Sequence, residues 1–157
     1  MKKIRRGVFE SNSSSTHSFS YAATINDLEV DDDNCVHTDL GKFGWEIRTY
    51  DWASVKLAYI LLAAASLTGH DFWWNDDRFT EELESFKETE QYQAIEDAVK
   101  LHMDCDGIVI NEGSSGYIDH QSIEYGSFDE WLWNTGADSI EDFIFGNIAL
   151  HTDNDNH

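Results

Sequence analysis

The stretch DWASVKLAYILLAAASLTG, residues 51–69, contains the most apolar run of the chain and decides its fold. Its large side chains recur at the spacing of one helical face, at Trp52, Val55, Tyr59 and Leu62. Asp51 is a suitable N-cap residue, and Gly69 suits the C′ position that follows a helix. Alanines fill many of the remaining positions, so we predict a buried helix at the centre of the core.

A second helical pattern follows between Asn75 and Met103. Its apolar side chains form two sets at helical spacing, Phe79, Leu83 and Phe86 and then Tyr92, Ile95, Val99 and Met103. The two sets lie on different faces. The tract is therefore either one helix or two helices that break near Thr89.

Strand patterns occur at both ends of the chain and in its centre. They cover residues 3–9, 18–25, 107–113, 116–123 and 147–152, and residues 35–50 and 107–123 each indicate a hairpin. Two short helices are expected at 127–134 and 138–145, begun by Ser127 and Asp138. The predicted fold class is α+β, with a mainly antiparallel sheet of N-terminal, central and C-terminal strands packed against helices around 51–68 and 76–103.

The composition indicates one domain over residues 1–157. The chain has no proline and no linker-like segment, and 41% of its residues are hydrophobic. Its two cysteines, Cys35 and Cys105, lack a zinc-binding spacing and indicate reduced thiols in a cytoplasmic protein. No signal peptide and no membrane-spanning stretch is recognisable, so we expect no membrane association.

Charge is the strongest compositional feature. The net charge is −21, and four of the ten basic residues lie within the first six positions, which leaves six basic against 31 acidic residues in the rest of the chain. Such a field disfavours direct binding to nucleic acid and attracts basic partners or cations. The candidate partner-binding residues lie at the start of the second helical tract: Asp76, Asp77, Glu81, Glu82, Glu84 and Glu88. They form either an ordinary solvated surface or a surface that imitates nucleic acid.

The serine-rich stretch FESNSSSTHSFS, residues 9–20, is a candidate ligand-binding loop. Hydroxyl groups, backbone N–H groups and four nearby basic residues are the groups that bind a phosphate or another anion. The candidate residues are Asn12, Ser13, Ser14, Ser15 and His17. The alternative is a loop whose polar side chains bond their own backbone. The pattern is not a P-loop, because it lacks the GxxxxGK[ST] spacing.

Two further polar segments are candidate parts of a site. Asp119, His120 and Gln121 lie in the expected returning strand, where Asp119 and His120 would point to opposite faces. The C-terminal DNDNH, residues 153–157, begins like a calcium-binding loop but ends before the glycine and glutamate that complete one. Asp153 and Asp155 are therefore candidate ligands of a divalent cation.

The amino-terminal sequence RRGVFESNSSSTHSF, residues 5–19, resembles the opening of a set of uncharacterised bacteriophage and prophage proteins. In that set a basic residue precedes FETNSSSTHS, and Ser11 stands here where threonine is usual. The segments YIDHQS, FIFGN and DNDNH are also similar to recurrent segments of the set. The resemblance implies a phage-related origin and the cytoplasm of a bacterial host cell, and it supplies no activity.

These features lead to different hypotheses about function. The first is a phage-encoded accessory or anti-defence protein that binds and blocks a basic, nucleic-acid-binding host protein as a DNA mimic. The alternative is a protein that binds a small phosphorylated ligand, or a metal-dependent hydrolase, whose site is assembled from the polar segments around His17, His120 and Asp153. That site requires the first, returning and last strands to be neighbours in one sheet. A structural or packaging accessory of a phage is a third hypothesis.

Overall fold

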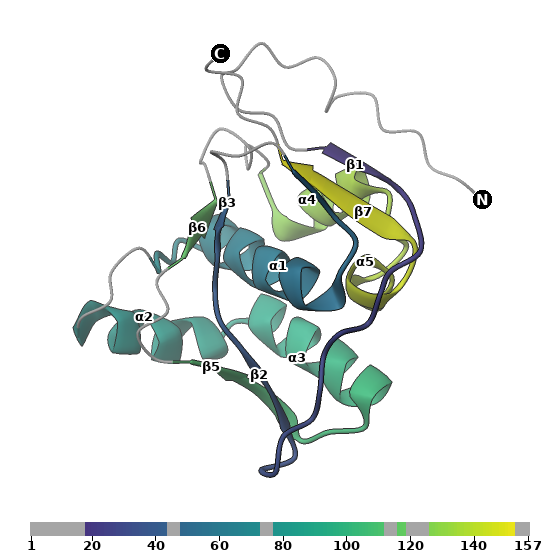
Figure 1. Cartoon of the computed structure of the whole chain (residues 1–157). Helices are drawn as coiled ribbons and strands as arrows, with labels where there is room; N and C mark the ends of the chain where they lie inside the picture. Colours follow the sequence, from purple (N-terminus) through teal and green to yellow (C-terminus); the bar gives the residue numbers. More distant parts are fainter. Residues whose placement is uncertain (1–17, 44–47, 73–76, 112–115, 119–125, 153–157) are drawn as a thin grey trace.

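The computed structural model describes residues 18–43, 48–72, 77–111, 116–118 and 126–152 (Figure 1). Its helices are α1 (Ala53–Leu67), α2 (Asp77–Lys87), α3 (Glu90–Met103), α4 (Phe128–Thr135) and α5 (Ile140–Phe145). Its strands are β1 (Ser18–Tyr21), β2 (Cys35–Thr38), β3 (Lys42–Phe43), β4 (Arg48–Tyr50), β5 (Gly107–Ile110), β6 (Tyr117–Ile118) and β7 (Ile148–Thr152). The expected strand at 3–9 lies outside these residues.

Helix α1 is the central element of the core, as its sequence predicts. Eleven of its fifteen residues are buried, and it contacts α3, α4, α5, β2 and β6. Figure 1 shows it between the sheet that contains β1 and β7 and helix α3. Since α1 is apolar on nearly all sides, only a position enclosed by other elements removes its surface from water.

The N-terminus of α1 is capped by a residue that is distant in sequence. Trp52, and not Asp51, occupies the N-cap position, and its side chain makes no capping hydrogen bond. Instead Asp27 accepts hydrogen bonds from the Ser54 N–H at 2.8 Å and from the Ser54 hydroxyl at 2.5 Å. The prediction of Asp51 was wrong because a carboxylate brought in by the fold satisfies the exposed N–H group equally well. The predicted C-terminal Gly69 is confirmed, with φ of +82°.

The acidic helical tract consists of two helices. Helix α2 ends at Lys87 and α3 begins at Glu90, with Thr89 as the N-cap of α3. The Thr89 hydroxyl accepts a hydrogen bond from the Tyr92 N–H at 3.1 Å. This capped break allows the apolar faces of the two helices to point in different directions, which explains why the sequence shows two separate apolar sets.

The antiparallel sheet joins the two ends of the described chain. Its strand order is β1–β7–β4. His151 of the central strand β7 lies opposite Ser18 of β1 on one side and opposite Thr49 of β4 on the other. The central strand β7 is buried at Ile148, Ala149 and Leu150. Together with the helices that pack against the strands, this sheet confirms the predicted α+β class.

The two predicted hairpins were wrong, because their strands pair with distant partners: β4 lies antiparallel to β7, and the other four strands form parallel pairs. Strand β5 pairs with β2, with Val36 opposite Ile108, and β6 pairs with β3, with Phe43 opposite Ile118. Parallel pairs need long crossover connections, which the helices between β3 and β5 supply here. The apolar run of β5 is typical of a strand buried inside an α/β arrangement, whereas a hairpin with one solvated face would alternate.

Helices α4 and α5 both pack against α1. Ser127 caps α4 as predicted, because its hydroxyl accepts a hydrogen bond from the Glu130 N–H at 3.1 Å. Helix α5 is capped by Ser139, whose hydroxyl binds the Asp142 N–H, so the prediction of Asp138 was wrong by one residue. Asp and Ser are both good N-cap residues, and sequence spacing alone does not separate neighbouring candidates.

An aromatic cluster connects these helices to the sheet and to α1. Trp131 of α4 lies with its ring centroid 6.1 Å from Phe19, 6.1 Å from Tyr59 and 5.4 Å from Phe143. These rings come from four different elements, so Trp131 is a junction of the core, meaning that its ring packs against β1, α1 and α5 at once. None of the helices in the described parts of the chain is both long enough and apolar enough to cross a membrane.

Candidate functional site

A row of carboxylates lies on the exposed side of α2. Asp77, Glu81 and Glu84 follow one another at intervals of four and three residues, and Glu88 continues the row in the turn after the helix. All four side chains are exposed, because the opposite face of α2 is buried through Phe79, Leu83 and Phe86. We call Asp77, Glu81, Glu84 and Glu88 the α2 stripe.

The α2 stripe contains most of the partner-binding residues that the sequence suggests. Glu82 is half-buried and lies off the stripe, and Asp76 is outside the described residues. The Lys87 ammonium nitrogen lies 3.9 Å from a carboxylate oxygen of Glu84. Because this ion pair is exposed to solvent, it neutralises little of the negative charge of the α2 stripe. In Figure 1, α2 is at the periphery of the molecule, so a partner can approach its outer side.

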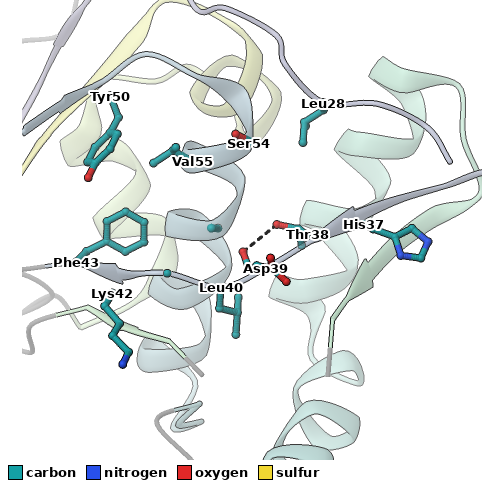
Figure 2. Close-up of a pocket in the computed structure, with 12 residues that line it drawn as sticks. Leu28, His37, Thr38, Asp39, Leu40, Lys42, Phe43, Tyr50, Ser54 and Val55 are labelled. Carbon is teal, nitrogen blue, oxygen red and sulfur yellow. Dashed lines mark hydrogen bonds between the residues drawn. The ribbon is translucent and has the colours of Figure 1, made fainter. Parts of the chain in front are cut away.

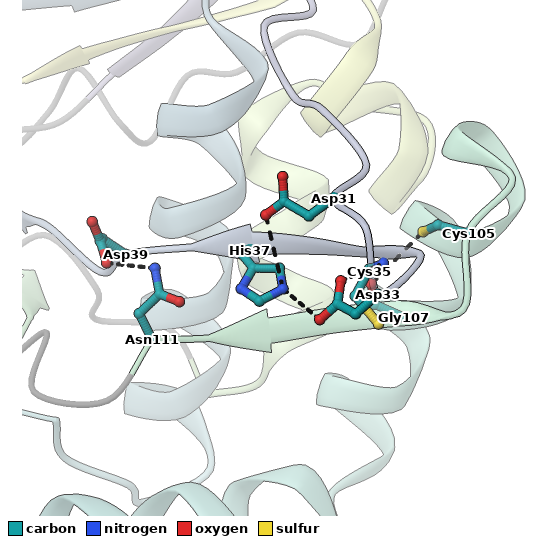
Figure 3. A network of polar contacts seen from close by, with 8 residues as sticks. All are labelled: Asp31, Asp33, Cys35, His37, Asp39, Cys105, Gly107 and Asn111. Carbon is teal, nitrogen blue, oxygen red and sulfur yellow. Dashed lines mark hydrogen bonds and ion pairs between the residues drawn. The ribbon is translucent and has the colours of Figure 1, made fainter.

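A second group of acidic residues surrounds His37 on β2. The Nε2 atom of His37 lies 2.6 Å from the Asp33 carboxylate and 3.8 Å from that of Asp31 (Figure 3). The hydrogen bond to Asp33 raises the pKa of His37, and the same bond lowers the pKa of Asp33. Both carboxylates favour the protonated form of the imidazole, an arrangement suited to fixing the acidic loop before β2.

Polar contacts also join β2 to β5. The Asn111 side chain donates a hydrogen bond to Asp39 at 2.8 Å, beyond the end of this strand pair (Figure 3). Cys105 is buried, with its sulfur 3.7 Å from the Gly107 carbonyl oxygen. Burial raises the pKa of the Cys35 thiol, which disfavours the nucleophilic thiolate. The Asn111–Asp39 hydrogen bond thus extends the contacts of the parallel pair beyond its last residues.

A cavity of about 440 Å³ lies between α1 and the segment that contains β2 and β3 (Figure 2). Its walls are mainly apolar and include Leu28, Phe43 and Val55, while Ser54 and Tyr50 contribute hydroxyl groups. Phe43 and Tyr50 meet edge to face, with their centroids 6.1 Å apart. The volume is within the usual range for a small-molecule site.

The ligand residues that the sequence predicts all lie in parts of the chain that the structure does not describe. The candidates that lie outside the described residues are Asn12, Ser13, Ser14, Ser15, His17, Asp119, His120, Gln121, Asp153 and Asp155. Where their segments attach is nevertheless defined. Ser18 and Thr152 both lie at one end of the β1–β7 pair, whereas Ile118 belongs to the separate β3–β6 pair.

His151 is a polar residue that the sequence did not single out. It lies on the central strand β7, with Nε2 2.6 Å from the Ser20 hydroxyl and Nδ1 2.9 Å from the Thr49 hydroxyl. The three side chains thus link the three strands of the sheet near the attachment points of the polar terminal segments. Among the residues that the structure describes, no group of three His, Cys, Asp or Glu side chains is arranged to hold a metal ion.

Lys56 is a second residue that sequence reasoning missed, although a lysine within an apolar helix is itself a signal. Its side chain is fully buried, and its ammonium group donates hydrogen bonds to the Thr24 hydroxyl and, at 2.6 Å, to the Ile148 carbonyl oxygen. Burial lowers the pKa of Lys56 to about 8, and the negative charges of Asp142 and Asp51 partly oppose this shift. Lys56 therefore ties α1 to the sheet.

The buried ammonium predicts a specific pH dependence of stability. Because the unfolded chain binds this proton more tightly, the free energy of unfolding should rise as the pH increases from about 8 to about 10.5. Relative to Lys56→Met, the wild type should gain roughly 3 kcal/mol over this interval, measured by urea denaturation. Comparison with the variant cancels the opposite effect of Tyr92, whose pKa burial raises. A difference between the two proteins that is independent of pH would contradict this role.

The fold and these sites define an acidic α+β protein with an exposed row of carboxylates and an apolar cavity beside its central helix. No protein-family model, no curated protein and no solved structure matches the chain.

Proposed function

We propose that this chain is a phage-encoded accessory or anti-defence protein that binds and blocks a basic, nucleic-acid-binding protein of a bacterial host. The α2 stripe is the observation that carries the proposal. It spans eleven residue intervals, or about 16 Å of helix. Its four charges are therefore separated by three steps of about 5.5 Å each, which is wider than the 3.4 Å of axis per charge of one DNA strand but of the same order.

The whole-chain charge supports the same conclusion. A net charge of −21 produces a long-range field that attracts a basic surface and accelerates its association. The α2 stripe presents part of this charge on a helix whose other face is fixed in the core, so little ordering is needed on binding. The resemblance of residues 5–19 to phage proteins supports a host protein as the partner.

Affinity capture with a matched pair of variants tests the proposal. The stripe variant carries Glu81→Lys, Glu84→Lys and Glu88→Lys, and the control variant carries Asp97→Lys, Asp129→Lys and Glu130→Lys at exposed positions outside the stripe. We expect the wild type and the control to retain a DNA-binding protein from bacterial lysate, and duplex DNA to elute it. Recovery of no such protein, or equal recovery by both variants, would contradict the proposal.

The cavity beside α1 supports a second candidate function, the binding of a small molecule. Asp27 at the N-terminus of α1 and Asp39 in the cavity wall offset the charge of Lys42, which also lines the cavity, so a phosphate group finds no excess of positive charge there. Apolar walls and aromatic rings favour instead an uncharged ring compound. This ligand class differs from the phosphorylated one that the sequence suggests.

Nuclear magnetic resonance with indole as the probe tests the cavity. Indole should shift the methyl signal of Ala58, which lines the cavity, and the variant Val55→Phe should remove this response by filling the space. Inorganic phosphate should leave the signal unchanged. Absence of an indole response, or the same response in the variant, would show that the cavity binds no such ligand.

A further inference from the structure

Two large apolar side chains are exposed next to each other at the start of α1. Ile25 is 52% exposed and Trp52 is 50% exposed. The two residues form a parallel β-bridge, and bridged residues direct their side chains to the same side of the backbone. We call Ile25 and Trp52 the apolar pair.

The backbone holds the apolar pair rigidly. The Ile25 N–H donates to the Asp51 carbonyl oxygen at 2.8 Å, and the Ala53 N–H donates to the Ile25 carbonyl oxygen at 2.9 Å. Trp52 is also the N-cap residue of the buried helix α1. A partner that contacts this pair therefore has little main-chain entropy to remove, which is the property of a preorganised binding anchor.

Negative charge continues from the apolar pair along the segment that follows Ile25. The side chains of Glu29, Asp31, Asp32 and Asp33 are exposed, and the end of this segment reaches Asp106, whose N–H donates to the Asn34 carbonyl oxygen at 2.7 Å. Asp51 lies next to Trp52 in the chain. Lys56 is close but fully buried, and His37 is held by Asp33 and Asp31.

We propose that the apolar pair anchors a basic protein segment in which a large apolar residue is flanked by lysine or arginine. The apolar residue would pack against Ile25 and Trp52 while its basic neighbours meet the acidic segment 29–33. Tryptophan is enriched among the residues that dominate interface energies, and its ring also attracts cations. A second copy of this chain is a poor occupant, because two surfaces of the same strong negative charge repel each other.

This inference rests on the proposed function for the charge of the partner, but not on the α2 stripe. It requires that the partner segment contain a large apolar residue in addition to its positive charge. A general polycation would bind by charge whatever its apolar content. A segment that uses the apolar pair must lose affinity when its own large apolar residues are removed.

Two synthetic lysine-rich peptides of equal charge provide the test, one with leucines between the lysines and one with serines in their place. Isothermal titration with the intact wild-type protein should give about ten-fold tighter binding of the leucine peptide. Trp52→Ala should reduce the affinity for the leucine peptide to that for the serine peptide. Trp133→Ala, which removes another exposed tryptophan on α4, should change neither affinity by more than about two-fold.

The outcomes separate this inference from the proposed function. Equal affinity of both peptides for the wild type, or equal losses in Trp52→Ala and Trp133→Ala, would overturn the anchor and leave an acidic binding protein. Failure of both peptides to bind would overturn the anchor and count against the proposed function as well. Because the Trp52 side chain makes no capping hydrogen bond, its removal should leave the fold intact, and Ile25→Ala provides an independent check on the same surface.

Discussion

Replacement of Trp131 by alanine should lower the free energy of unfolding by about 4 kcal/mol. The side chain is only 1% exposed and contacts the rings of Phe19, Tyr59 and Phe143. Its loss would leave a cavity between α4, the sheet and α1, and rigid neighbouring elements cannot close such a space. Urea denaturation followed by circular dichroism measures the change.

Trp133 supplies the matched control on the same helix. It is 56% exposed, so Trp133→Ala should change the free energy of unfolding by less than about 1 kcal/mol. Similar losses in the two variants would show that Trp131 is not a junction of the core. Unfolding of Trp131→Ala in two separate transitions would show that α4 and the sheet are not one cooperative unit.

Reversal of three charges on the α2 stripe should weaken binding to the basic partner by about 100-fold or more. Each reversal replaces an attraction across the interface by a repulsion, and three such changes on one surface act together. The control variant, with Asp97, Asp129 and Glu130 reversed, has the same net charge and should lose much less. Surface plasmon resonance at several salt concentrations measures both affinities.

Salt dependence gives the same comparison a second readout. Binding of the wild type should weaken as salt is raised, because salt screens charges separated by more than about 10 Å at 0.1 M ionic strength. The stripe variant should show a flatter dependence, since fewer charges take part. Equal salt slopes for the two variants would indicate that total charge, and not the α2 stripe, determines binding.

Local sequence patterns predicted the helices but not the pairing of the strands. Helix α1 is encoded by its own apolar periodicity, whereas the pattern of 75–103 left one helix or two helices breaking near Thr89 as alternatives, and the structure has two. Pairing of β2 with β5 depends instead on residues about 70 positions apart, which no local pattern records. The Asp27 cap of α1 was missed for the same reason, because the carboxylate reaches Ser54 only in the folded chain.

The candidate site was predictable to the extent that it depends on charge and helical spacing. The α2 stripe follows from the sequence once the buried face of α2 is recognised. The cavity beside α1 is lined by residues from several separate segments, so no single stretch of sequence marks it. His151 was missed because its hydroxyl partners, Ser20 and Thr49, come from neighbouring strands.

Competition with DNA tests the central claim most directly. Labelled duplex DNA bound to the captured host protein should be released when the wild-type chain is added, as measured by fluorescence anisotropy. The control variant should release it at a similar concentration, whereas the stripe variant should require about 100-fold more. Retention of the DNA at saturating wild-type chain, or equal potency of the two variants, would contradict the account.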